Sequence, residues 1–249
     1  MGVSGSEAAH PEVGRPEVDR ASSRWLLPWR PLRPGDIVDV VAPASAASLD
    51  QLEAAVAVLE RWGLRAHVPA GLLAAEPFFA NSDAERWRYL RRALTNTDSR
   101  AVWCLRGGVG CLRLVPKLVA LKKPTVPKPL IGFSDISVLH TVIDQSWRGH
   151  PVHGPVLTQL LPDKIRAVDI RRLRDLLFGQ TDLIEVPGLR ALNEAARKCE
   201  SVSGRLAGGN LATLQTLAGT PGALQGRGRI ICLEDTNERG YTVDRMLAG

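Results

Sequence analysis

The chain has few cysteines, few aromatic residues and no long hydrophobic run. Its cysteines show no C-x-x-C spacing, which argues against a zinc site. Three of them lie in apolar runs, so we predict buried free thiols and a reducing compartment. No stretch of about eighteen apolar residues is present, so the sequence predicts no membrane span. The four cysteines are Cys104, Cys111, Cys199 and Cys232.

Charge of one sign is not gathered into a block. The 32 Lys and Arg are interleaved with 26 Asp and Glu, which leaves a formal net charge of +6. Nucleic-acid binders concentrate positive charge on one face beside aromatic side chains, and this chain has only two Tyr and four Phe. We therefore expect no nucleic-acid partner, although a cationic cleft could attract acidic substrates.

The first residues contain no apolar core of the kind that a secretory signal requires. Gly, Glu, Ala, Arg and Pro dominate this stretch, so we predict a disordered leader over residues 1–30 and a cytoplasmic location. Overall, 45% of the residues are hydrophobic and 23% are charged, which is typical of a folded globular protein.

From residue 34 onward, short apolar runs alternate with segments of helical periodicity. This alternation predicts a parallel sheet with crossover helices, and therefore an α/β fold. Ser82 and Glu85 form a capping box for a helix whose buried stripe would contain Trp87, Leu90 and Leu94. The predicted strands are 36–42, 65–69, 101–105 and 129–133, and the predicted helices are 49–59, 82–94, 111–121 and 136–145.

The alternation of short apolar runs and helical segments changes after residue 155. We predict a helix over 170–178, a polar and irregular stretch over 187–203, a helix over 211–218 and a strand over 229–233. These patterns divide the chain into an N-terminal α/β domain over 31–185, a linker over 186–203 and a second unit that begins at residue 204 and runs to 249.

Ser134 lies where an apolar strand passes into a helix, in Gly132-Phe133-Ser134-Asp135. A serine on such a turn exposes its hydroxyl, and the following helix directs its positive end toward developing negative charge. This arrangement suits a nucleophile. The alternative is that the serine only caps the helix.

A second turn, Arg106-Gly107-Gly108-Val109-Gly110, also follows a predicted strand. Glycines allow successive N–H groups to form one concavity, which can hold an oxyanion or a phosphate. A dinucleotide fingerprint would need a third glycine where Arg113 stands, and a phosphate-binding P-loop would need Gly-Lys-Ser/Thr. A tight turn without a ligand is the plain alternative.

Glu234 and Asp235 follow the last predicted strand. A carboxylate there could accept a hydrogen bond from a catalytic histidine and hold its tautomer. Carboxylates at strand ends are also common as surface or capping groups.

Taken together, these motifs resemble the LD-carboxypeptidase family, which includes muropeptide LD-carboxypeptidases and microcin C self-immunity enzymes. The order and spacing agree over about residues 34–247. The segments that carry the resemblance are 35–43, 105–114, 131–136, His153-Gly154-Pro155, Gly208-Gly209-Asn210-Leu211, and Leu233-Glu234-Asp235 with Asp244-Arg245-Met246-Leu247.

The resemblance implies a serine peptidase with a Ser-Glu-His triad, in which Ser134 is the nucleophile and Glu234 is the triad carboxylate. Gly108 and Asp135 would supply the N–H groups of the oxyanion hole. It also implies a doubly wound, Rossmann- or flavodoxin-like N-terminal domain, a smaller β-rich C-terminal domain and an active site between them. Neither cofactor nor metal is implied, and the partners would be a small peptide or muropeptide and a second copy in a homodimer. The remaining expected pocket residues are Arg106, Gly107, Val109, His153, Gly209 and Asn210.

Two departures from the family pattern affect the site. Val109 stands where the family has tyrosine in the glycine turn. The family's histidine lies in a Gly-His motif downstream of the Asp-Arg-Met-Leu helix, so we expect a C-terminally truncated chain with an incomplete second domain and no triad histidine. His140 is six residues beyond Ser134, about 240° around a helix, and should face away from it. His153 should form part of the wall of the expected substrate pocket.

The resulting hypothesis is a serine-type carboxypeptidase that hydrolyses an LD-peptide bond, at the terminal D-alanine of a murein tetrapeptide, through an acyl-enzyme. One alternative is an inactive protein that retains the pocket and binds the ligand without turnover. A microcin C-type immunity hydrolase is another, and a phosphate or nucleotide binder using residues 107–110 is a third.

Overall fold

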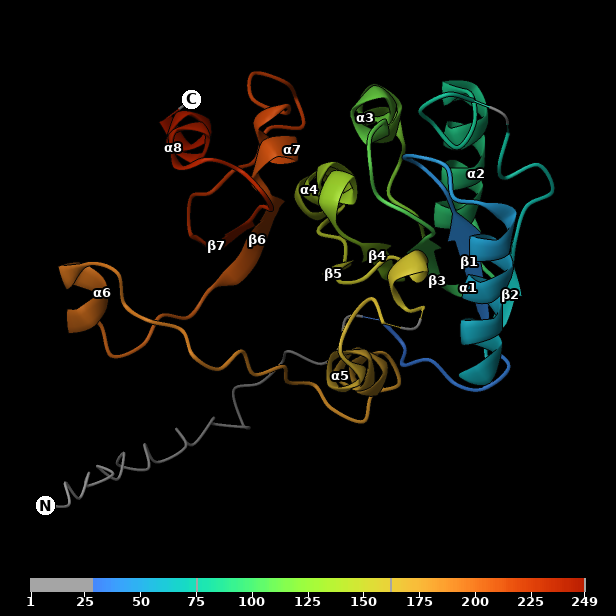
Figure 1. Cartoon of the computed structure of the whole chain (residues 1–249), viewed down its shortest axis with the longest axis horizontal. Coiled ribbons are helices and arrows are strands. Elements are labelled where there is room, and N and C mark those ends of the chain that lie inside the picture. Colours follow the sequence, from blue (N-terminus) through green and yellow to red (C-terminus); the bar gives the residue numbers. More distant parts are fainter. Residues whose placement is uncertain (1–28, 75, 162, 249) are drawn as a thin grey trace, which may run out of the picture.

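The structure is a computed structural model that describes residues 29–74, 76–161 and 163–248. The leader predicted over residues 1–30 therefore lies outside the described residues, except for its last two. Figure 1 shows a sheet flanked by helices and, beside it, a smaller unit formed by the C-terminal elements.

The large sheet is parallel throughout, in the order β2-β1-β3-β4-β5. This is the doubly wound order of flavodoxin-like folds, so the predicted α/β class is confirmed. The strands are β1 (Ile37–Val41), β2 (Arg65–His67), β3 (Ser99–Cys104), β4 (Leu130–Gly132) and β5 (Pro151–His153).

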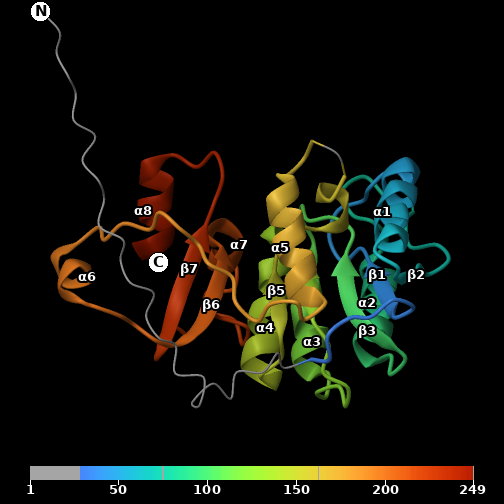
Figure 2. The same cartoon turned by 90° about the horizontal axis from the view of Figure 1, so that it is seen from below.

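Helices cover both faces of this sheet. One face packs against α1 (Leu49–Arg61) and α5 (Ala167–Leu177), and the other packs against α2 (Asp83–Thr95), α3 (Val115–Ala120) and α4 (Ser137–Trp147). Figure 2 shows the sheet from the side that α5 covers. Successive residues of β3 alternate between the two hydrophobic cores, which is why the strand reads as one continuous apolar run.

Three details of the first domain differ from expectation. A 3-10 turn over residues 111–114 precedes α3, so that Pro116 falls in the first turn of the helix, where proline is tolerated. Strand β5 was not predicted, since it has three residues and begins with proline. On α2 the buried stripe contains Arg86 beside Leu90 and Leu94, whereas Trp87 is only partly buried.

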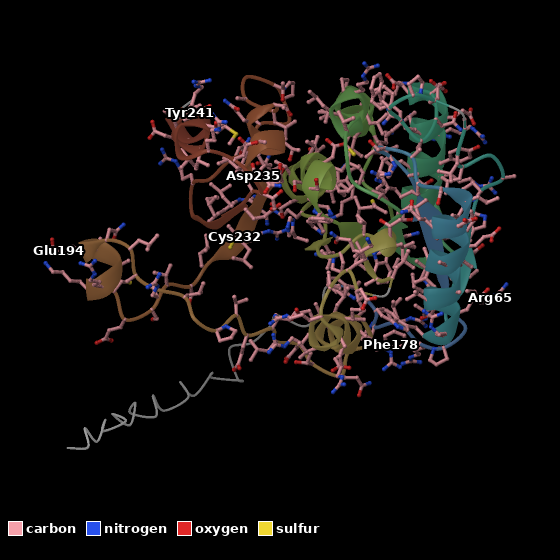
Figure 3. The ribbon with its side chains drawn as sticks, viewed as in Figure 1. Arg65, Phe178, Glu194, Cys232, Asp235 and Tyr241 are labelled. Atoms are coloured by element: carbon pink, nitrogen blue, oxygen red, sulfur yellow. The ribbon has the colours of Figure 1, made fainter. Side chains whose placement is uncertain are left out.

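The C-terminal unit is built on a second parallel sheet. It consists of β6 (Arg205–Asn210) paired with β7 (Arg229–Glu234), together with α7 (Leu211–Gln215) and α8 (Gly240–Ala248). The stretch predicted as a linker, 186–203, is exposed and contains one short helix, α6 (Glu194–Lys198). Figure 3 shows Glu194 of α6 well away from the large sheet.

Ion pairs join the C-terminal unit to helix α4. Buried Asp144 accepts hydrogen bonds from the guanidinium groups of Arg205 on β6, at 2.8 Å from Nε, and of Arg229 on β7. Arg205 also donates to the carbonyl of Gly149 at 3.1 Å. Both strands of the second sheet are therefore anchored to the helix that follows Ser134.

Of the three cysteines in apolar runs, two are buried as predicted and one is not. Cys104 and Cys111 are buried free thiols, whereas Cys199 and Cys232 are exposed. Cys232 lies on β7 (Figure 3), whose sheet has only two strands, so the apolar side chains Ile231 and Leu233 beside it are also exposed. None of the described helices has the length and apolarity to cross a bilayer.

We expect Asp144→Asn to lower the free energy of unfolding by about 2 kcal/mol, because two guanidinium groups lose their charged acceptor. Urea denaturation followed by tryptophan fluorescence measures this change. Glu194→Gln, which removes an exposed pair with Lys198, is the matched control and should change it by less than about 0.5 kcal/mol. Equal midpoints for the two variants would show that the Asp144 cluster does not anchor the sheet.

Candidate active site

Ser134 occupies a strained turn at the carboxyl end of β4. Its φ is 61°, in the left-handed region that side chains with a Cβ rarely adopt. A 3-10 turn over Ser134–Ile136 then leads into α4, and the side chain of Ser134 caps neither element. The capping alternative is therefore wrong. Ser134 is half-buried, so the hydroxyl is not sealed in the core.

The tightness of this turn explains the glycine two residues earlier. A Cβ on Gly132 would lie 3.0 Å from the side chain of Ile136, on the far side of the turn. The chain therefore doubles back closely enough that any larger residue would push the turn open. The geometry is that of a nucleophile elbow, in which strain holds the hydroxyl at the end of a strand.

The glycine turn that follows β3 lies directly against Ser134. A Cβ on Gly107 would be 3.1 Å from the serine Cβ and 3.4 Å from its Oγ. Gly108 and Gly110 have φ of 109° and 130°, values that favour glycine. The two predicted turns are thus adjacent, as expected from the neighbouring carboxyl ends of parallel strands.

A third loop, after β1, holds the glycine turn in place. Ser45 Oγ accepts a hydrogen bond from the N–H of Val109 at 3.2 Å, and the Ser45 N–H donates to the carbonyl of Gly107 at 3.2 Å. Arg106 donates to the Ala46 carbonyl at 2.7 Å. The role of Ser45 was not predicted, since nothing in its local sequence indicates which distant loop it will contact.

Asp135 joins the serine turn to the glycine turn. Its buried carboxylate accepts a hydrogen bond from the N–H of Cys111 at 2.8 Å. Burial raises the pKa of Asp135, while the Cys111 hydrogen bonds and the charge of Arg86 act in the opposite direction. The residue predicted to contribute a backbone N–H thus also contributes a side chain that fixes the separation of the two loops.

Glu234 approaches the first domain at His153. Glu234 Oε1 lies 3.8 Å from His153 Nε2, beyond hydrogen-bond distance but close enough for electrostatic attraction. This oxygen is buried and has no hydrogen-bond partner among the described residues. Burial lowers the pKa of His153, and the Glu234 carboxylate opposes that change.

Gly209 and Asn210 also contact the first domain. A Cβ on Gly209 would lie 2.5 Å from Ser137 Oγ, and the N–H of Asn210 donates to the same oxygen at 3.0 Å. The Asn210 side chain caps α7 and donates to Asp235 at 3.2 Å. Thr213 Oγ1 donates to the Ser134 carbonyl at 3.4 Å. The segments around residues 134 and 234 therefore lie on neighbouring surfaces.

A cavity of about 450 Å³ separates β5 and α4 from the second sheet. Its lining includes His153 and Glu234, and also His140, whose buried Nε2 has no partner among the described residues. The rings of His140 and His153 are 6.3 Å apart, and burial lowers the pKa of His140 to about 3. His140 is therefore neutral and belongs to the cavity wall.

The predicted rim residues are more exposed. The Val109 side chain is 52% exposed, so the position where the family has tyrosine faces solvent. Arg106 is also exposed, with its guanidinium turned toward the Ala46 carbonyl. Within the described parts of the chain, no group of three or more His, Cys, Asp or Glu residues could hold a metal ion.

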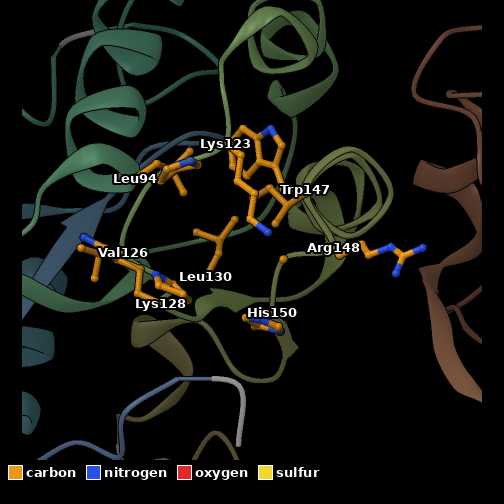
Figure 4. A pocket seen from close by; sticks show the side chains of 12 residues that line it. Leu94, Lys123, Val126, Lys128, Leu130, Trp147, Arg148 and His150 are labelled. Atoms are coloured by element: carbon orange, nitrogen blue, oxygen red, sulfur yellow. The ribbon is translucent and has the colours of Figure 1, made fainter.

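A separate apolar pocket lies at the opposite end of β4 from Ser134 (Figure 4). It is enclosed by Leu94, Leu130 and Trp147, and Lys128 and His150 are at its edge. Burial lowers the pKa of Lys128 to about 8, although its ammonium donates to the Ala93 carbonyl and to Ser99 Oγ. The pocket lies at the amino ends of β4 and β5, whereas Ser134 follows the carboxyl end of β4. The pocket is therefore separate from the candidate active site.

The comparisons with known proteins agree with this architecture. The family model of the LD-carboxypeptidase N-terminal domain matches residues 38–154, and that of the C-terminal domain matches 203–249. A murein tetrapeptide carboxypeptidase of Pseudomonas aeruginosa is 37% identical over 224 residues, which are 88% of this chain and 72% of that protein.

Solved structures show the same fold. The muramoyltetrapeptide carboxypeptidase of Oxalobacter formigenes superposes with a TM-score of 0.68 at 27% identity, over 85% of this chain and 70% of that one. The microcin C7 self immunity protein MccF superposes with a TM-score of 0.70 at 20% identity, over 88% and 74% of the two chains.

The fold and the site therefore define a two-sheet α/β protein with a strained serine turn beside a glycine turn. The chain belongs to the LD-carboxypeptidase family. It spans 59% and 54% of the lengths of two Rickettsia relatives, each 37% identical to it over the matched residues.

The contact between His153 and Glu234 can be tested by NMR titration of the His153 ring. We expect a pKa below the ordinary value of 6.5 and a further decrease in Glu234→Gln, because the carboxylate charge that favours protonation is removed. Glu238→Gln, an exposed position in the loop that follows β7, should leave the His153 titration unchanged. An unchanged midpoint in Glu234→Gln would mean that these side chains do not face each other in solution.

Proposed function

We propose that this protein is a serine-type carboxypeptidase that acts on an LD-peptide bond, with Ser134 as nucleophile and Glu234 as the orienting carboxylate. The observation that supports it best is the left-handed backbone of Ser134, a strained and half-buried position directly beside the glycine turn. Backbone strain of this kind persists where the surroundings impose it, and it concentrates at active sites.

In the proposed reaction, Ser134 Oγ attacks the carbonyl carbon of the scissile bond and gives up its proton to a base. The negative oxygen of the tetrahedral intermediate would accept hydrogen bonds from the N–H groups of Gly108 and Asp135. Collapse breaks the C–N bond, the departing D-amino acid takes the proton, and the acyl group stays on Ser134. Water then cleaves the ester and regenerates the hydroxyl.

The base in this scheme is a histidine, which the family resemblance assigns to a Gly-His motif beyond residue 247. Glu234 would hold its tautomer, since Glu234 Oε1 is buried and without a hydrogen-bond partner among the described residues. His153 would remain part of the wall, where its lowered pKa keeps it neutral at pH 7. The proposed triad therefore requires a histidine beside Glu234 Oε1.

For the substrate we favour a murein tetrapeptide with a terminal D-alanine. The Pseudomonas aeruginosa relative that is named for this substrate shares 37% identity with the chain, whereas MccF shares 20%. The cavity beside Glu234, about 450 Å³, is large enough for part of a small peptide. A cytoplasmic location, a homodimer and the domain boundaries at residues 186 and 203 remain predictions.

A second candidate is a protein that binds the same ligand without hydrolysing it. Two buried polar atoms, Glu234 Oε1 and His140 Nε2, have no partner within the described residues, and both residues line the cavity. Such atoms are costly unless a ligand or water satisfies them. Binding without turnover in the unmodified protein would favour this candidate.

In the presence of the histidine that the proposed triad requires, we expect Ser134→Ala to lower the turnover of murein tetrapeptide by on the order of 10⁶-fold, because the attacking oxygen is removed. Ligand affinity should be little changed, since the cavity wall is intact. Release of D-alanine by mass spectrometry measures turnover, and calorimetry measures affinity. Ser201→Ala, at an exposed position in the linker, is the control. Undiminished turnover in Ser134→Ala would exclude Ser134 as the nucleophile.

A further inference from the structure

Arg86 is a fully buried cation in the first domain. It lies on α2, where its side chain has 0% exposure although the residues around it form an apolar stripe. Burying an arginine is expensive unless each of its N–H groups finds a partner. Its hydrogen-bond partners therefore show which segments the buried guanidinium holds together.

The guanidinium joins three loops. Nη1 donates to the carbonyl of Pro43, after β1, and to the carbonyl of Gly110 at 3.1 Å, in the glycine turn. Nε donates to the Asn81 carbonyl at 3.1 Å, and Nη2 donates to the Asp83 carboxylate at 2.5 Å. The glycine turn beside Ser134 and the loop after β1 that holds this turn are thus connected through one side chain.

The charge of Arg86 is balanced locally. Burial alone would raise the pKa of Asp83, but hydrogen bonding to Arg86 and the charges of Arg86 and Arg113 bring it below its ordinary value. The guanidinium groups of Arg86 and Arg113 both lie over the ring of Phe79. Their Cζ atoms are 4.8 Å and 4.7 Å from the ring centroid. Ion pair and cation–π contacts together stabilise the buried cation.

This cluster also explains why residue 110 is glycine. A Cβ there would lie 2.7 Å from Arg86 Nη1 and 2.9 Å from Phe79, in addition to the strain of a φ of 130°. The backbone at residue 110 therefore lies against the guanidinium and leaves no room for a side chain. The very next N–H, that of Cys111, donates to Asp135, which adjoins Ser134.

We propose that Arg86 is a positioning residue for the active site: it sets the glycine turn against the serine elbow without touching the substrate. This inference rests on the proposed function for the reactivity of Ser134. A lysine could keep the charge, but its single ammonium cannot reproduce the planar fork that spans Pro43, Gly110 and Asp83. A displacement of the turn by about 1 Å is enough to cost on the order of 10² in rate.

The test measures covalent labelling of Ser134 by a fluorophosphonate, in which Oγ bonds to phosphorus, fluoride leaves and the hydroxyl proton is released. Intact-mass spectrometry gives the second-order rate constant, and near-UV circular dichroism gives the folded fraction. The variants are Arg86→Ala and Arg86→Lys. Arg88→Ala, on the exposed face of the same helix and paired with Glu85, is the matched control.

We expect Arg86→Ala to label roughly 10²-fold more slowly per folded molecule, and millimolar guanidinium chloride to restore much of the rate by occupying the vacated site. Arg86→Lys should also be slow and should not respond to guanidinium. Arg88→Ala should label like the unmodified protein. Recovery with guanidinium is a result that a general loss of stability would not produce.

Three results would overturn the proposal. These are full labelling rates in folded Arg86→Ala or Arg86→Lys, a slow Arg86→Ala that guanidinium does not accelerate, or failure of both variants to fold. If the unmodified protein is not labelled, the proposed function fails instead. Hydrogen exchange at the Cys111 amide then decides: faster exchange in the folded variants supports the positioning role, and unchanged exchange contradicts it.

Discussion

The site depends on one constraint, which is the left-handed backbone at Ser134. A residue with a Cβ adopts this conformation uncommonly, and at strained sites its neighbours hold it there. Here the neighbours are the glycine turn on one side and the Asp135–Cys111 hydrogen bond on the other. The positions of the hydroxyl and of the expected oxyanion donors therefore follow from the same set of contacts.

Those contacts come from loops at the carboxyl ends of β1, β3 and β4, which the parallel sheet brings to one edge. In doubly wound folds this edge is where ligands bind, since the loops there are free of the sheet hydrogen bonding. The second sheet is placed beside it by the Asp144 cluster and by Gly209, which lets the backbone pass close to Ser137. Both contacts help to hold Glu234 at the cavity.

Much of this could be predicted from the sequence, because Ser134, Gly107 and Glu234 each follow an apolar run that ends abruptly. Local pattern places these residues at strand ends, whereas the roles expected for them come from the family resemblance. Arg86 and Ser45 could not be predicted in the same way, since their partners are 43 and 64 residues away in the chain. An arginine on an apolar helical stripe was the one available signal. The exposure of Cys232 was missed because an apolar strand usually indicates a sheet covered on both faces, and β7 is not.

Helix α4 has a double role that follows from its two ends. Its first turn follows the turn at Ser134, and Asp144 in its last turn holds β6 and β7, the second of which ends at Glu234. Because the helix rises about 1.5 Å per residue, its length sets the spacing between the turn at Ser134 and the Asp144 anchor of the second sheet. A change in the length of this one element would therefore shift the second sheet relative to Ser134 without a substitution at Ser134 or Glu234.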